Sequence, residues 1–125
     1  MEYLVQMRLA DSGRSTSPAA GAVFIEQYIL PTLARCERLQ REGRIVAGGP
    51  VSGAVALSFV IRADSAPEID ALLGGLPVWP LMVTTVTPLT TWQQRGAALR
   101  PSLERLRAGQ TRTEALASSA TSASP

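Results

Sequence analysis

Segments with strand-type and helix-type patterns follow one another in a particular order along most of the chain. Apolar residues alternate along EYLVQMRL, as expected for a strand with one buried face. The predicted strands are 2–9, 44–50, 54–63 and 81–89, and the predicted helices are 18–42 and 66–73. This order predicts an α+β protein with the ferredoxin-like βαββαβ fold, in which a four-stranded antiparallel sheet carries two helices on one face.

The first predicted helix has a marked beginning, interruption and end. Ser17 is a favourable N-cap, and Pro18 suits the first helical position because the N–H that it lacks would be unpaired there. Gly43 follows the last residue with helical spacing and is a typical C-cap. Pro31 lies inside the segment and should kink or split the helix near Tyr28.

The second face of the predicted sheet is also apolar. In the expected register it carries Leu4, Ala56, Val60, Met82 and Val86. A sheet with helices on one face and apolar side chains on the other requires a partner. We therefore expect two copies to pair through their sheets as a dimeric α+β barrel, giving a homodimer or a larger homo-oligomer.

The chain is expected to divide into a domain and two C-terminal segments. The ferredoxin-like domain covers 1–92. Segment 93–109 has leucines at rough helical spacing, so we expect a helical extension that packs on a neighbouring subunit. Segment 110–125 is rich in Ala, Ser and Thr, which predicts a disordered tail. The leucines of the extension are Leu99, Leu103 and Leu106.

Composition excludes several classes of function. The formal net charge is only +2 and the basic residues form no cluster, so we expect no nucleic-acid partner. The absence of His and Lys excludes a His-activated nucleophile, a Schiff-base lysine and imidazole ligation of a metal. The sequence also lacks a glycine-rich phosphate loop, and its carboxylates have no metal-ligand spacing. We therefore expect no cofactor and no metal.

The single cysteine and the N-terminal residues give a prediction of the cellular compartment. Cys36 excludes an internal disulfide and falls in an apolar helical series, where we expect it to fill the core. Glu2 stands where a signal peptide would have basic charge, and no segment approaches the roughly 20 apolar residues of a membrane span. These features predict a cytoplasmic protein without a membrane partner.

The segment GLPVWPLM joins the second predicted helix to the last strand. Gly75 ends the helix, and Pro77 prevents its continuation. Pro80 suits the first residue of a strand, where no donor of the sheet is lost. Trp79, held between the two prolines, either covers the end of the core or forms a wall of a ligand pocket.

Two separated motifs resemble a known family. The stretch LARCERLQREG, followed by LPVWPLM and then VTPL, is similar in content and order to motifs of the muconolactone isomerase family. The resemblance covers roughly residues 2–92 and extends more distantly to YciI-like proteins. It implies a ferredoxin-like fold assembled through sheet contacts, in dimers or rings of dimers. It also implies cofactor-independent proton transfer on a small unsaturated lactone.

Such a reaction needs few groups. A base removes a proton beside a carbonyl and returns it one vinyl unit away, while a donor stabilises the dienolate oxygen. Glu26, about one turn before Pro31, is the leading candidate for the acid and base, and Tyr28 is the candidate donor. A solvated helix-face charge would explain Glu26 equally, and simple packing would explain Tyr28.

Six further residues are candidates for substrate binding. Arg8 and Arg44 lie on predicted strands and could bind a carboxylate with two hydrogen bonds. Charges on strand edges that discourage aggregation have the same pattern. Trp79 would form a pocket wall. The polar strand residues Gln6, Ser58 and Thr84 complete the set.

The resemblance favours a muconolactone isomerase-like enzyme that moves a proton on a small unsaturated lactone or enol substrate. One alternative is a cyclase of a polyketide-like biosynthetic intermediate. Another is a non-catalytic ligand-binding or assembly protein of the same fold. A cofactor-independent oxygenase is also compatible with the sequence.

Overall fold

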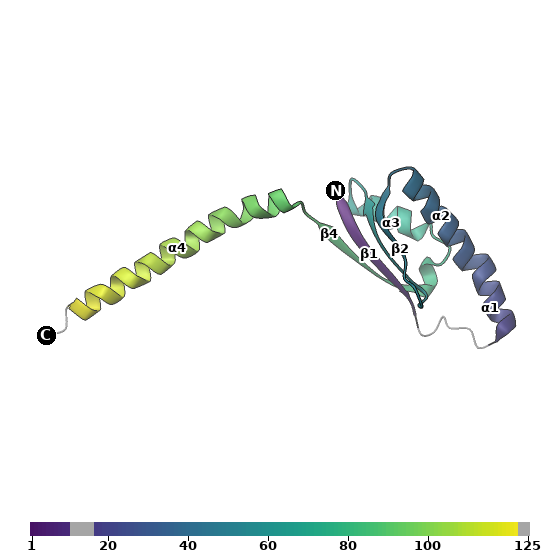
Figure 1. Ribbon diagram of the computed structural model, residues 1–125, viewed down its shortest axis with the longest axis horizontal. Coiled ribbons are helices and arrows are strands. Elements are labelled where there is room, and N and C mark those ends of the chain that lie inside the picture. Colours follow the sequence, from purple (N-terminus) through teal and green to yellow (C-terminus); the bar gives the residue numbers. More distant parts are fainter. Residues whose placement is uncertain (11–16, 123–125) are drawn as a thin grey trace. The chain divides into compact units, whose positions relative to one another are not determined.

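The computed structural model describes residues 1–10 and 17–122 of the chain. These fall into two units, Met1–Leu89 and Thr90–Pro125. The first unit contains the sheet and the shorter helices, and the second contains one long helix (Figure 1). The boundary lies close to the end of the predicted domain.

The first unit has the predicted order of elements. Its strands form one antiparallel sheet in the order β2-β3-β1-β4, and the helices lie on one side of it (Figure 1). This confirms the ferredoxin-like α+β fold. The elements are β1 (Glu2–Leu9), α1 (Pro18–Phe24), η2 (Ile25–Ile29), α2 (Leu30–Arg41), β2 (Ile45–Pro50), β3 (Ala56–Arg62), α3 (Ala66–Gly74), η3 (Trp79–Leu81) and β4 (Met82–Leu89).

The core lies between the sheet and the helices. On the central strand β1, alternate residues are buried because successive side chains of a strand point to opposite faces. Val5 and Met7 are almost completely buried, and they lie opposite Phe59 and Leu57 of β3, which are also buried. The helices cover this face with further apolar residues, among them Ile69 of α3.

The open face of the sheet differs from the prediction at β4. Met82 and Val86 pair with Leu9 and Val5, so they lie on the helix-facing side and not on the open face. The strand begins after the 3₁₀ turn η3, and a shift of one residue in register moves every side chain to the other face. The other three residues of the prediction do lie on the open face, and these are Leu4, Ala56 and Val60.

The first helix is divided, as Pro31 predicted. A π-helical turn, η2, separates α1 from α2, and the N–H of Leu30 donates to the carbonyl of Ile25, five residues earlier. In a regular α-helix the ring of Pro31 would clash with the carbonyl four residues earlier, and Pro31 has no N–H to donate to that carbonyl. The wider π turn immediately before Pro31 relieves this conflict. Its five residues include Tyr28.

The segment after α3 forms a rigid corner. Gly75 caps α3, and Leu76 and Val78 are buried. The backbone N–H of Val78 donates to Oγ1 of the buried Thr32 on α2, at 3.2 Å. Pro80 lies inside the 3₁₀ turn and not at the start of the strand, because the chain makes one more turn before β4 begins. Thr32 thus ties this corner to α2.

The second unit is a single helix, α4 (Trp92–Ser122). Thr91 and Gln94 form a reciprocal capping pair at its N-terminus, since each side chain accepts a hydrogen bond from the other's backbone N–H. The helix continues beyond 109, through most of the segment predicted as a disordered tail, where alanines favour helix. Leu99, Leu103 and Leu106 are exposed on it. Within the described residues, no helix is both long and apolar enough to span a membrane.

Candidate functional site

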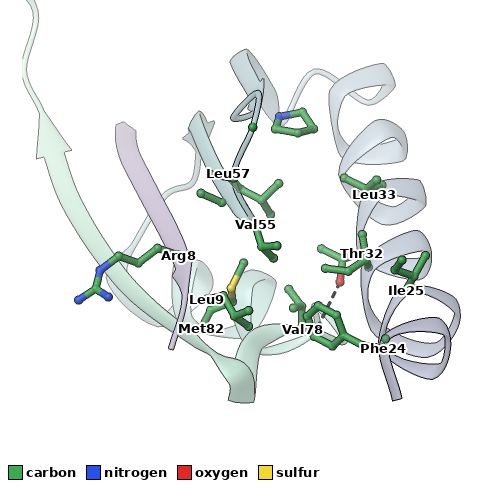
Figure 2. Close-up of a pocket in the computed structure, with 16 residues that line it drawn as sticks. Arg8, Leu9, Phe24, Ile25, Thr32, Leu33, Val55, Leu57, Val78 and Met82 are labelled. Carbon is green, nitrogen blue, oxygen red and sulfur yellow. Dashed lines mark hydrogen bonds between the residues drawn. The ribbon is translucent and has the colours of Figure 1, made fainter. Parts of the chain in front are cut away.

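A cavity of about 950 Å³ lies in the first unit, between the divided helix and the end of the sheet where β1 finishes and β3 starts (Figure 2). Its helical wall comes from α1, η2 and α2, and its other walls come from the sheet, the β2–β3 turn and the corner before β4. Most of the lining is aliphatic or aromatic, including Phe24, Ile25, Ile29, Leu33, Val55, Leu57, Val78 and Met82.

One hydrogen bond and the π turn shape the cavity walls. The hydrogen bond from Val78 to Thr32 joins the corner to α2, and both residues line the cavity. The π turn presents Ile25 and Ile29 to it from one side of the helix. Since π turns occur frequently at functional sites, the interruption caused by Pro31 coincides with the wall of a candidate site.

The polar groups of the lining are few. Thr32 already accepts the hydrogen bond of Val78, and Arg8 directs its guanidinium away from the cavity (Figure 2). The strand register explains this direction, because Arg8 lies opposite Ala56 and Val83 on the open face. Among the described residues that line the cavity there is no carboxylate and no phenol.

The two predicted catalytic residues lie on the π turn but not in the cavity lining. Glu26 is exposed and follows the lining residue Ile25 directly. Tyr28 is half-buried, packs on the core, and stacks at a tilt on Phe24 with ring centroids 6.0 Å apart. Both residues therefore lie on an element that forms part of the cavity wall, but neither side chain lines the cavity.

Three of the predicted binding residues meet at a smaller hollow on the open face. Gln6, Arg8 and Ser58 line this hollow of about 390 Å³ together with Thr85. Thr85 pairs with Gln6 in the register, and sequence reasoning missed it because the expected register of β4 was one residue out. Thr84 faces the helix side instead, where its Oγ1 is buried and has no hydrogen-bond partner among the described residues.

The other two predicted binding residues have structural contacts elsewhere. Arg44 forms an ion pair and hydrogen bond with Glu68. The backbone N–H of Asp64 also donates to Glu68, at 2.8 Å, and this bond and then Arg44 lower the pKa of the Glu68 carboxyl. Trp79 packs on the core and does not line the cavity, whereas its neighbour Val78 does.

Sequence reasoning did not identify the apolar residues that line the cavity. Phe24, Leu33 and Val55 have the spacing and composition of core residues, and no pattern in the sequence separates a cavity wall from a filled core. Cys36, assigned to the core from the sequence, does pack against it, and burial raises the pKa of its thiol.

Comparison with known proteins agrees with this architecture. The sequence model of the muconolactone delta-isomerase family matches residues 1–95. A crystal structure of muconolactone isomerase is 26% identical, with a TM-score of 0.58 over 73% of this chain and 90% of that chain.

A second solved structure shares the fold. It is 5-chloro-2-hydroxyhydroquinone dehydrochlorinase (TftG) from Burkholderia phenoliruptrix AC1100, in complex with 2,5-dihydroxybenzoquinone. It is 21% identical, with a TM-score of 0.54 over 75% of this chain and 98% of that chain. No curated protein sequence matches the chain. The family match covers the whole sheet-and-helix unit, and the chain therefore belongs to the muconolactone delta-isomerase family.

Proposed function

We propose that the protein is a cofactor-independent isomerase that moves a proton on a small unsaturated lactone or enol substrate. The observation that carries this proposal is the apolar cavity beside the π turn, in the part of the chain that matches the muconolactone delta-isomerase family. A cavity of about 950 Å³ has the size of small-molecule sites in general, which range over about 300–1,000 Å³.

The reaction balances without an oxidant or reductant. In an α,β-unsaturated lactone such as muconolactone, a base breaks the C–H bond at the ring carbon one vinyl unit from the carbonyl, and the electron pair delocalises onto the carbonyl oxygen as a dienolate. The same group then returns the proton to the carbon beside the carbonyl, so that one C–H bond replaces another and the double bond moves. The protein must supply the base and a donor for the oxygen.

Glu26 is the proposed acid and base, and Tyr28 is the proposed donor. Glu26 follows a lining residue on the π turn, so its carboxylate can meet a substrate at the rim of the cavity. An apolar substrate that covers the rim would exclude water from this carboxylate, which suits a group that must both take and return a proton.

The open face is proposed to have a separate role in assembly. Pairing of two sheets would cover the apolar residues of this face together with the hollow at Gln6, Arg8 and Ser58. In a dimeric α+β barrel these polar side chains would lie inside the barrel, where the Arg8 guanidinium could bind a carboxylate.

Deuterium exchange tests the proposed chemistry. The purified full-length protein is incubated with muconolactone in D₂O, and the proton spectrum is followed over time. We expect deuterium beside the carbonyl, or the isomerised product, to appear faster than in buffer. Glu26→Gln should lower the rate of this exchange and isomerisation by about 100-fold or more. Glu37→Gln is the matched control, because Glu37 is an exposed carboxylate of α2 that does not border the cavity.

Two results would contradict parts of this proposal. If Glu26→Gln retains the wild-type rate within a few-fold, the carboxylate is not the base. If the wild-type protein exchanges no faster than buffer, muconolactone is not a substrate.

The size and apolar lining of the cavity also favour a second candidate, a cyclase of a polyketide-like intermediate. The lack of a carboxylate or phenol in the described lining favours a non-catalytic ligand-binding protein instead. Ring closure of a supplied intermediate would identify the cyclase, whereas binding without any turnover would identify the binding protein.

A further inference from the structure

The volume and lining of the cavity limit the class of substrate that the proposed reaction can use. We infer that the cavity binds a ligand whose buried part is an apolar system of two or three fused rings, with its reacting enol or lactone group at the rim beside Glu26. This inference rests on the proposed function, because it concerns the same cavity.

The size of the cavity favours a ligand larger than a single ring. The cavity volume of about 950 Å³ is near the upper end of the range for small-molecule sites. A single-ring lactone would fill a small part of it and leave much of the apolar wall in contact with water. A fused-ring ligand would cover more of that wall, and each additional buried carbon strengthens binding.

The apolar interior of the cavity favours a ligand whose buried part is hydrocarbon. Arg8 points away from the cavity, and the Thr32 hydroxyl is already bonded to the Val78 N–H (Figure 2). A carboxylate placed deep inside would find no cation directed at it from the described lining, and Thr32 would offer only its O–H as a donor. Burying a charged or unpaired polar group is costly. The interior therefore selects hydrocarbon, and the polar part of the ligand stays outside it.

The rim of the cavity lies next to Glu26 in the sequence. Ile25 lines the cavity yet is about half exposed, so it marks the rim. Glu26 is its neighbour on the π turn. A ligand with its rings inside and its enol at the rim would bring its acidic C–H bonds to this carboxylate.

A ring-size series tests the inference on the full-length protein. Calorimetric titration with phenol, 2-naphthol and 2-hydroxyanthracene should show the dissociation constant falling by about tenfold or more with each added ring. Equal affinity for the three probes, or strongest binding of phenol, would overturn the inference.

Two variants locate the binding. Ile25→Asp places a charge on the cavity rim and should weaken 2-naphthol binding by about tenfold or more. Val23→Asp is the matched control, since Val23 is 47% exposed and Ile25 51% exposed, and only Ile25 lines the cavity. The control should change the affinity less than twofold. Equal weakening by both variants would overturn the inference.

A measurement on the wild type guards against misfolding of Ile25→Asp. Proton contacts from bound 2-naphthol to the methyl groups of Leu33 and Val78 are expected, and contacts to Val83 on the open face instead would overturn the inference.

Failure of the ring-size series is distinguishable from failure of the proposed isomerase. If muconolactone exchanges deuterium but the three probes bind with equal affinity, only the ring-size inference is overturned. If the affinity rises with each added ring but muconolactone exchanges no deuterium, the ring-size inference is supported and the proposed activity on muconolactone is overturned.

Discussion

The hydrogen bond between Thr32 and Val78 should be required for the stability of the first unit. Replacing Thr32 by Val keeps the shape of the side chain but removes the oxygen that accepts the Val78 N–H. Thr32 is only 2% exposed and Val78 is fully buried, so water cannot replace the lost acceptor. The variant therefore leaves a buried donor unpaired.

The magnitude follows from that burial. Leaving a buried donor without a partner costs about 1–3 kcal/mol. For a unit of this size, each kcal/mol lowers the melting temperature by about 4–8 °C. We expect the free energy of unfolding of Thr32→Val, measured with urea, to fall within that range below the wild-type value.

A control separates the hydrogen bond from packing. Thr32→Ser keeps the hydroxyl and loses one methyl group, which costs about 1 kcal/mol. The amide hydrogen of Val78 should exchange with solvent much faster in Thr32→Val and stay protected in Thr32→Ser. If Thr32→Val is as stable as the wild type and its Val78 amide remains protected, the bond does not hold the corner to α2.

Three further predictions concern other parts of the chain. The pKa of Glu68 is lowered in the folded protein, so its contribution to stability is present above its unfolded pKa and is lost as the pH falls through the folded value. Glu68→Gln should therefore destabilise the protein to urea at pH 7 but not in acid, and an equal loss at both would contradict the ion-pair explanation. The Cys36 thiol, whose pKa is raised by burial, should react slowly with a thiol reagent in the native protein and rapidly in denaturant; rapid native reaction would refute its place in the core. If α4 packs on a neighbouring subunit, Leu103→Ser should lower the mass measured by sedimentation, and an unchanged mass would argue against that contact.

The fold was predictable because each element has its own local signal. The capping residues Ser17 and Ser65 accept hydrogen bonds at the starts of α1 and α3, and the alternation in β1 gives its buried face directly. The register of β4 was not predictable, because it depends on how many residues the 3₁₀ turn consumes. That error of one residue exchanged Thr84 for Thr85 at the open-face hollow.

The candidate site was only partly predictable for a related reason. Pro31 marked the position of the π turn, and Glu26 and Tyr28 lie on it. The cavity walls were not recognisable, because an apolar residue beside empty space has the same sequence pattern as one in a packed core. Arg44 was predicted to bind substrate, but it forms an ion pair with Glu68. The two residues are distant in the sequence, so this pair is recognisable only in the structure.

Mapping the bound ligand tests the central claim, that the reaction takes place in the cavity beside the π turn. The isotope-labelled full-length protein would be titrated with muconolactone while its assigned amide signals are followed. We predict that the largest shifts occur at Phe24, Val55 and Val78, which line the cavity. Shifts concentrated at Gln6 and Thr85 on the open face would contradict the claim.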